Sequence, residues 1–359
     1  MRTWARAVLG LWLAASASAQ PAEPEKLIEA GHWKRARAIV DARLGQAPND
    51  ALSNFLLSQI RAAFGDRVTP LPLAEKAVAL DGRVAKYHRQ VAEVLGVTAQ
   101  HSNALKQLFL ARRFRQEIDQ ALALDPKDTQ AQRDLLEYDL LAPGIVGGDV
   151  KKAAATAERI AALDPAEGFL AQARVAEYQH QNADAEKWLR KAAALPNYKT
   201  RILLAQFYLA PEHFNAAGAE NQARYALALD RSRAGAYAIL AEVYAARAQW
   251  ADLDATLAEA TRQVPDDAAP YYRAASRLLA DGRDPERAER YLRVYLAQEP
   301  EGNEPPAAEA HWKLGLALEA MGRKNDAVAE WNEAVRLDHD SPAVRELRRV
   351  RGVRSASAF

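Results

Sequence analysis

The side chains that could perform catalysis or hold a metal are scattered along this sequence. There are seven histidines, none three or four residues from another, so no helix presents a pair of metal ligands, and the HExxH zinc motif is absent. The chain has no cysteine, which excludes disulfides, thiolate zinc sites, iron–sulfur clusters and cysteine nucleophiles. The sequence therefore predicts no catalytic residues, no metal and no cofactor, and a protein that is not an enzyme. A zinc site assembled from distant histidines is the alternative that the linear sequence leaves open.

Two short sequences carry weaker signs of chemistry. His101-Ser102 has no third partner for a serine nucleophile and no GxSxG elbow. The second is the glycine-rich stretch 142–149. A glycine-rich loop before a helix can bind phosphate, but here Asp149 would place its own carboxylate at the N-terminus of that helix, and no GK[ST] motif follows. We expect an elongated turn in which Pro143 stops one helix and Asp149 caps the next. A rim contact for a partner is the alternative role of this loop, through Pro143, Gly144, Gly147 and Gly148.

Composition and charge narrow the class of protein. The 359 residues would make about two to three ordinary domains of ~150 residues. The net charge is +1, from 48 basic and 47 acidic residues, which argues against a nucleic-acid or membrane-surface binder. Few aromatic residues, few glycines and abundant alanine favour helices.

Residues 1–19 have the pattern of a secretory signal peptide. Arg2 and Arg6 precede the short apolar run 7–15, and Ala17-Ser18-Ala19 forms a cleavage pattern before Gln20. A membrane anchor is the alternative, but the run is about half of the ~20 residues that span a bilayer. Cleavage would leave 359 − 19 = 340 residues with a net charge of +1 − 2 = −1 and no transmembrane segment. We therefore expect a periplasmic or secreted protein.

The remaining chain shows an internal repeat, most clearly after residue 307. If Ala308 is position 1, small residues stand at positions 8, 20 and 27 (Gly315, Ala327 and Ala334). Large residues stand at positions 7, 11 and 24 (Leu314, Leu318 and Trp331). Small residues let two helices approach closely, and large ones fill the space between adjacent units. The spacing resembles the tetratricopeptide repeat (TPR), a helix–turn–helix unit of 34 residues.

The same frame recurs upstream, with Asp-Pro or a similar helix stop closing each unit. Repeat ends are expected near residues 48, 82, 126, 165, 196, 231, 265, 300 and 339. The sequence thus predicts an all-α, right-handed TPR-like solenoid of about nine helix–turn–helix repeats over residues 20–340. Residues 341–359 are expected to form a capping helix, from Ala343 to about Val350, and a basic tail.

Two interior units are clearly longer than the 34-residue spacing. One carries an insertion at 96–114 and a long helix expected over 104–124, and the next carries the loop 142–149. The apolar side chains of the long helix are expected in the core, with a projecting, partner-binding end as the alternative. With its APGIVGG-type loop, the stretch 30–265 is similar to a group of exported bacterial TPR proteins. That resemblance implies an envelope protein without catalysis and brings no defined activity.

Counting along the repeat places a set of mixed-charge residues on the concave face. The predicted groove residues are Arg133, Arg174, Glu177, Gln206, Glu242, Arg273, Arg277 and Trp312. For Trp312, packing under the C-terminal cap is the alternative. These residues predict a scaffold that docks a protein or peptide of the cell envelope, with no nucleic acid. The alternative is a ligand-binding module for a glycan or small hydrophobic solute, which a closed apolar cavity beside Trp312 or under 96–114 would indicate. The sequence does not determine the oligomeric state.

Overall fold

A computed structural model describes residues 23–356, so the expected signal peptide and its cleavage site before Gln20 lie outside the described residues. Within 23–356 the backbone forms nineteen α-helices, two short 3-10 helices and no strand, which confirms the all-α prediction. The helices are α1 (Pro24–Ala30), α2 (Trp33–Gln46), α3 (Ala51–Ala63), α4 (Pro70–Leu80), α5 (Ala85–Gln100), α6 (Ala104–Leu124), α7 (Thr129–Leu141), α8 (Val150–Leu163), α9 (Pro165–Tyr178), α10 (Asn182–Ala193), α11 (Tyr198–Leu209), α12 (Ala216–Leu229), α13 (Ala234–Ala246), α14 (Trp250–Gln263), α15 (Ala269–Ala280), α16 (Pro285–Leu296), α17 (Ala307–Ala320), α18 (Lys324–Leu337) and α19 (Ala343–Ala356). The 3-10 helices are η1 (Gly144–Val146) and η2 (Pro211–His213).

Consecutive helices pack as nine pairs, from α1/α2 to α17/α18, with α19 against α18. The last pair shows why the small positions must be small. A Cβ atom on Gly315 would lie 2.2 Å from Nε1 of Trp331, so only glycine lets that indole reach α17. Trp331 is 1% exposed, and its Nε1 donates to the carbonyl oxygen of Trp312 (3.2 Å). Ala327 and Ala334 are fully buried in the same core.

The second helix of several pairs ends in the same way. The backbone N–H of an aspartate donates to the carbonyl of a fully buried alanine four residues earlier, at Asp81, Asp125, Asp230 and Asp338. Each aspartate follows the leucine that ends its helix, and its extended φ and ψ turn the chain out of the helix. The repeated alanine and leucine–aspartate pattern thus fixes both the contact and the end of the helix.

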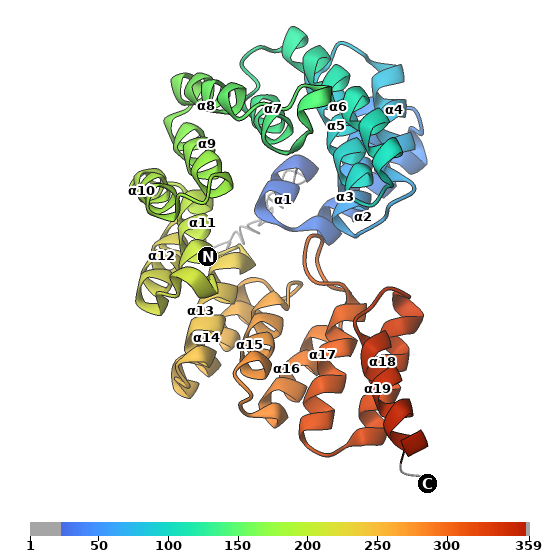
Figure 1. Cartoon of the computed structure of the whole chain (residues 1–359), viewed down its shortest axis with the longest axis vertical. Coiled ribbons are helices and arrows are strands. Elements are labelled where there is room, and N and C mark those ends of the chain that lie inside the picture. The colour runs from blue at the N-terminus through green and yellow to red at the C-terminus, as the bar shows by residue number, and fades with distance from the viewer. Residues whose placement is uncertain (1–22, 357–359) are drawn as a thin grey trace, which may run out of the picture.

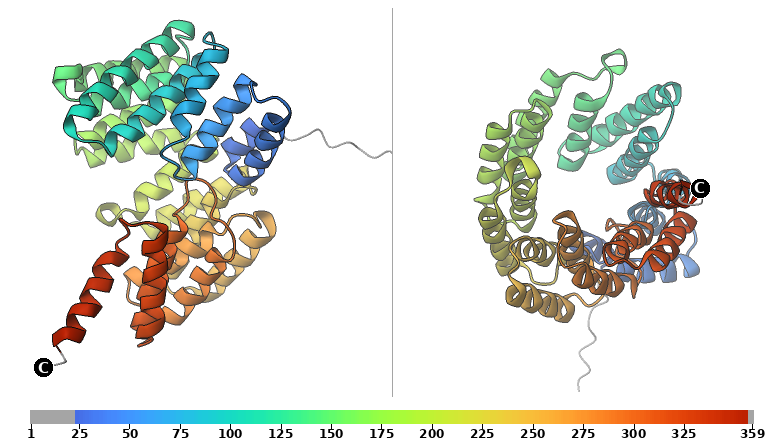
Figure 2. Two further views of the ribbon diagram at one scale, coloured as in Figure 1. Left: turned by 90° about the vertical axis from the view of Figure 1, so that its right-hand side faces the viewer. Right: turned by 60° about the horizontal axis from the view of Figure 1, so that its bottom comes forward.

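The pairs follow one another around a central hollow (Figure 1). α9 and α11 lie nearer the hollow than their partners α10 and α12. The array makes about one circuit, and the loop between α16 and α17 reaches the first helix pairs (Figure 2). A loop of the C-terminal half therefore touches the N-terminal helix pairs.

We call this contact the seam: α2 and the end of α3 against Asp266 and the loop 298–304. The first turn of α2 lacks a side-chain cap from its own N-cap residue His32. Glu301 supplies one instead, because the backbone N–H of Lys34 donates to its Oε2 (3.0 Å). Lys34 Nζ also donates to the carbonyl oxygen of Glu299 (2.7 Å).

Two ion pairs and one close backbone contact complete the seam. Arg35 Nε lies 2.7 Å from Asp266, and Arg37 Nη1 donates to Glu299 Oε1 at 3.0 Å. Asn303 N–H donates to the carbonyl of Ala63 (2.7 Å). A Cβ on Gly302 would lie 2.7 Å from Cγ of Trp33, so glycine is required there. Sequence reasoning missed this contact, although the 39-residue spacing before His339 contained the extra loop.

Both irregular units agree with the helix expectations. α6 runs over the expected residues 104–124. The 142–149 loop has Gly147 at φ +103° and Asp149 as the cap of α8, accepting from Lys151 N at 2.8 Å. The final helix is longer than expected, since α19 continues beyond Val350 to Ala356. Gly352 follows Val350 by two residues but lies within this helix and does not end it.

Substitution of Gly315 tests the close approach of α17 and α18. We expect Gly315→Ala to lower the free energy of unfolding by about 1–3 kcal/mol, because the added methyl group displaces Trp331. Urea unfolding followed by tryptophan fluorescence measures this. Gly45→Ala is the control, since a Cβ there meets nothing within 4 Å and alanine favours the helix. Equal stability of both variants would contradict the packing.

Cross-linking tests the seam, because the chain contains no cysteine of its own. In Ala63→Cys/Asn303→Cys a short bismaleimide is expected to join the two positions within one chain, since their backbones are hydrogen-bonded. The control pair Ala63→Cys/Asn332→Cys places the second thiol on α18, outside the seam, and should not cross-link. Mass spectrometry of the tryptic peptides reads the result, and an absent 63–303 link would mean that the array is open.

Candidate functional site

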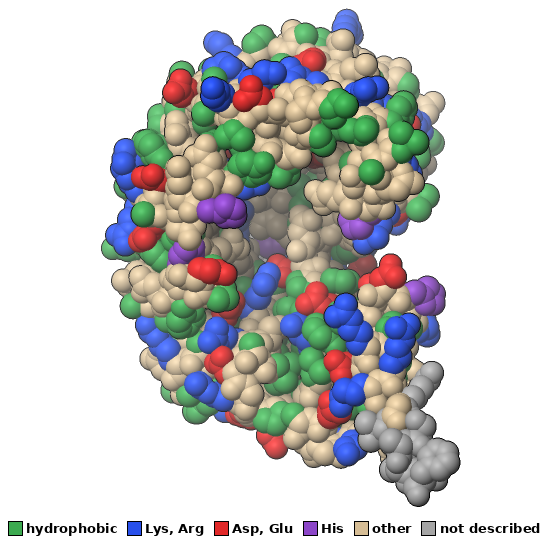
Figure 3. Space-filling view, viewed as in Figure 1, with side chains coloured by type: hydrophobic (Ala, Val, Ile, Leu, Met, Phe, Trp, Pro, Cys, Tyr) green, Lys and Arg blue, Asp and Glu red, His purple; other side chains and the backbone are tan. Residues whose placement is uncertain are grey.

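The concave side of the array is hollowed and carries charges of both signs. Figure 3 shows a deep hollow in this face, with basic and acidic side chains gathered along its lower wall. Three cavities border the concave side or the insertions, and we describe each from the helices that form it.

The first cavity, of about 280 Å³, brings together four of the predicted groove residues. Arg133 on α7, Arg174 and Glu177 on α9, and Gln206 on α11 all line it. They come from the first helices of three successive pairs, with Arg133 in the first half of α7 and the other three in the second halves of α9 and α11. We call this cavity the central groove. Leu170, Leu189 and Phe207 supply its apolar floor.

Most charges of the central groove already have partners. Arg174 binds Glu137 with both arms of its guanidinium, at 2.8 and 3.0 Å. Glu167 joins Arg133 (3.3 Å) to Lys199 (2.7 Å). These pairs fix the side chains in place, so the groove is preformed.

The C-terminal groove residues form a second group. Burial raises the pKa of Glu242, and the nearby Arg273 and Arg277 oppose that shift. Arg277 is paired with Asp281 (2.9 Å) and stacks over Phe214, whereas Arg273 is exposed. The structure thus places Glu242, Arg273 and Arg277 together, but not in the central groove.

Trp312 stands apart from both groups. It is half-buried and packs against the large C-terminal core, with Lys313 Nζ 5.3 Å from its ring centre. Its indole Nε1 is buried without an acceptor among the described residues. This position agrees with packing beneath the cap, and its role in a groove stays a prediction.

Two carboxylates that sequence reasoning missed lie side by side on the concave surface. Glu93 on α5 and Asp134 on α7 line a wide hollow of about 730 Å³, which also reaches Asn303 of the seam. Burial, and next the Glu93 carboxylate, raise the pKa of Asp134 to about 8, against the effect of Arg89. Burial likewise raises the pKa of Glu93. Both lie on the first helix of a pair, but no local sequence signal marks their burial.

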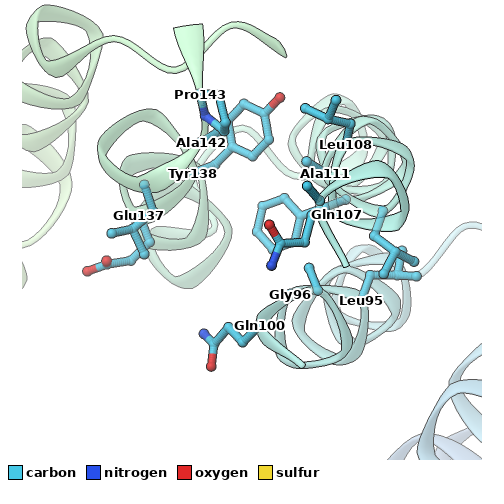
Figure 4. Close-up of a pocket in the computed structure, with 15 residues that line it drawn as sticks. Leu95, Gly96, Gln100, Gln107, Leu108, Ala111, Glu137, Tyr138, Ala142 and Pro143 are labelled. Atoms are coloured by element: carbon cyan, nitrogen blue, oxygen red, sulfur yellow. The ribbon is translucent and has the colours of Figure 1, made fainter. Parts of the chain in front are cut away.

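The third cavity, of about 460 Å³, lies between α5, α6 and the end of α7 (Figure 4). Its walls are Leu95, Leu108, Ala111, Phe114 and Tyr138, with the amides of Gln100 and Gln107 at one side. We call it the insertion cavity. It lies under 96–114, where a closed apolar cavity would indicate ligand binding, and it is mainly apolar but open at its mouth.

The loop 142–149, which we call the rim loop, closes one side of the insertion cavity. Pro143 lines the cavity and Gly144 is exposed, while a Cβ on Gly148 would lie 1.8 Å from the carbonyl oxygen of Ala142. Tyr138 holds the loop, because its hydroxyl donates to the carbonyl of Val146 and its ring stacks on Phe114 of α6 (5.6 Å). The two irregular stretches of the sequence therefore form one structural unit.

Residues 23–356 also bear on metal binding and on membrane insertion. No group of three or more histidine, aspartate or glutamate side chains in this part stands close enough to hold a metal ion. None of its helices is both long enough and apolar enough to cross a membrane.

The raised pKa of Asp134 predicts a pH dependence of stability. The folded protein holds this proton more tightly than the unfolded chain does, so stability should fall as the pH rises from 3.8 towards about 8. Asp134→Asn is expected to reduce that fall in urea unfolding measured at pH 5 and pH 9. Asp340→Asn, at an exposed acid, is the control. An unchanged slope in Asp134→Asn would show that this proton is not bound.

Comparison with known proteins gives no match to a family model and none to a curated protein. Three solved structures align at low scores: a TPR protein from Parabacteroides merdae (13% identity, 71% of this chain and 96% of that chain, TM-score 0.43), the type IV pilus biogenesis factor PilW (16%, 57% and 89%, 0.38) and the MamA protein (18%, 48% and 90%, 0.35). Because these scores are low, the assignment rests on the molecule itself. Its nine helix pairs, their spacing and the packed glycine and alanine positions show a TPR-like solenoid.

Proposed function

We propose that this protein is a non-catalytic interaction scaffold of the bacterial periplasm, which docks a segment of a partner protein in its concave groove. The observation that carries the proposal is the central groove, where Arg133, Arg174, Glu177 and Gln206 from successive repeats line one hollow. The signal-peptide pattern of residues 1–19 supports the export.

The physical basis is the rigidity of the surface. Binding an extended segment costs less conformational entropy when the receptor side chains are already held, as the Arg174–Glu137 and Arg133–Glu167–Lys199 contacts hold them. Mixed charges give a partner short-range contacts of both signs rather than long-range attraction. Several modest contacts then add up to a specific complex.

A second candidate function is binding of a small hydrophobic solute for envelope transport. The insertion cavity favours it, because its lining is mainly apolar and its volume of about 460 Å³ falls in the usual range for ligand pockets. It has few hydrogen-bonding groups for a glycan, since Tyr138 already donates to Val146.

Charge reversal tests the second group of predicted groove residues, which lies outside the central groove. Arg273→Glu/Arg277→Glu is expected to lose a partner that the native protein retains in affinity purification from periplasm after cross-linking, because both cations lie beside Glu242 on the predicted groove. The matched control is Arg262→Glu/Arg290→Glu, which reverses two exposed arginines on the second helices α14 and α16.

Quantitative mass spectrometry compares the three samples. Loss of the same protein from the groove variant alone places the docking surface. Equal recovery with all three proteins contradicts the assignment of Arg273 and Arg277, and an absence of any partner after cross-linking counts against the scaffold itself.

A further inference from the structure

The stretch that forms two walls of the insertion cavity has an unusual charge. Residues 94–116 contain four basic side chains, Lys106, Arg112, Arg113 and Arg115, and no acidic one. Arg113 is paired with Glu75, and Arg115 with Asp119. Lys106 and Arg112 are exposed. In a chain of nearly balanced charge, this cavity is therefore flanked by cations.

The acidic side of the cavity is neutralised. Glu137 is the one carboxylate among its lining residues, and Arg174 binds both oxygens of that carboxylate. The remaining polar lining consists of the Gln100 and Gln107 amides and the Tyr138 hydroxyl. An anionic group at the mouth would therefore meet no unpaired negative charge from the cavity wall.

The mouth joins the apolar interior to the adjoining wide hollow, whose lining carries charges of both signs, Lys106 and Glu93 among them. Gly96, Gln100 and Phe114 line both the insertion cavity and the adjoining wide hollow, and Lys106 lines that hollow. In Figure 4 the Gln107 side chain reaches into the cavity, whereas the Gln100 amide lies at the edge of the cavity and points away from α6. A molecule with its head at Gln100, Gln107 and Lys106 can thus extend its tail towards Leu108, Ala111 and Tyr138.

Three large exposed apolar side chains also occur on the outer face of α6 and on the rim loop, although none of these three lines the cavity. On α6, Leu105 is 81% exposed and Phe109 67%, and on the rim loop Ile145 is 80% exposed. Exposure of such residues to water is unfavourable, and covering them with an apolar ligand lowers the free energy. The cavity and its border therefore match an amphiphile better than a sugar.

We propose that the insertion cavity binds a single-chain anionic amphiphile of the fatty-acid class. The acyl chain lies between α5, α6 and α7, and the carboxylate lies at Gln100, Gln107 and Lys106. This proposal rests on the second proposed function and names its ligand. It is independent of partner docking in the central groove.

Binding of cis-parinaric acid at pH 8, followed by its fluorescence, tests the proposal on the full chain without residues 1–19. Ala111→Trp fills the cavity and is expected to abolish binding. Its control is Ala155→Trp, at an exposed alanine of α8. Lys106→Glu is expected to weaken binding about tenfold through loss of a charge-assisted contact, with Lys151→Glu as the matched control on an exposed lysine of α8.

The possible outcomes distinguish the fatty-acid ligand from the more general hydrophobic-solute function. Saturable binding that both cavity variants weaken and both controls retain supports the proposal. Failure of the native protein to bind, or equal binding by all variants, overturns it. If the neutral probe N-phenylnaphthylamine binds and Ala111→Trp blocks it, while parinaric acid does not bind, the anionic ligand is wrong and the hydrophobic-solute function stands. Binding restricted to phosphatidylglycerol vesicles would also overturn the proposal, in favour of a membrane surface.

Discussion

The structure depends on one constraint: no helix pair can bury its apolar face alone. Each pair must approach its neighbours closely enough to exclude water, and this needs small side chains at the contact. Gly315 against Trp331 is the tightest example, and the fully buried alanines Ala77, Ala121, Ala226 and Ala334 repeat the principle along the array. Stability is then a sum of contacts between neighbours. The composition of the chain, rich in alanine and poor in aromatic residues, follows from this requirement.

The same constraint explains what the sequence could predict. A local pattern repeated every 34 residues reports on contacts between adjacent helices, so the helix pairs, the limits of α6 and the cap at Asp149 follow from it. The repeat frame also predicted four groove residues that line one cavity in the structure, namely Arg133, Arg174, Glu177 and Gln206. Glu242, Arg273 and Arg277 form a separate group, because a position in the repeat fixes the face of a helix and not its distance from a given cavity. Trp312 lies half-buried against the C-terminal core, and its place in a groove stays a prediction.

Other features of the structure could not be predicted from a local sequence pattern. The insertion cavity forms where two irregular stretches meet, and neither stretch shows the other on its own. The pairing of Tyr138 with Phe114 and Val146 is what joins them. Glu93 and Asp134 could not be distinguished from other acidic residues by type, because carboxylates are frequent in a chain that is 26% charged. Their significance arises from burial, which only the folded molecule defines.

The seam also has a consequence for the order of folding. The bond from Lys34 to Glu301 joins residues 267 positions apart, whereas nearly every other contact joins neighbouring helices. Contacts of high sequence separation require the closure of a long loop and form slowly. Because α2 is synthesised far ahead of residues 298–304, the N-terminal pair must exist for a time with its seam surface uncovered. The array therefore assembles from local contacts, and closure is its final step.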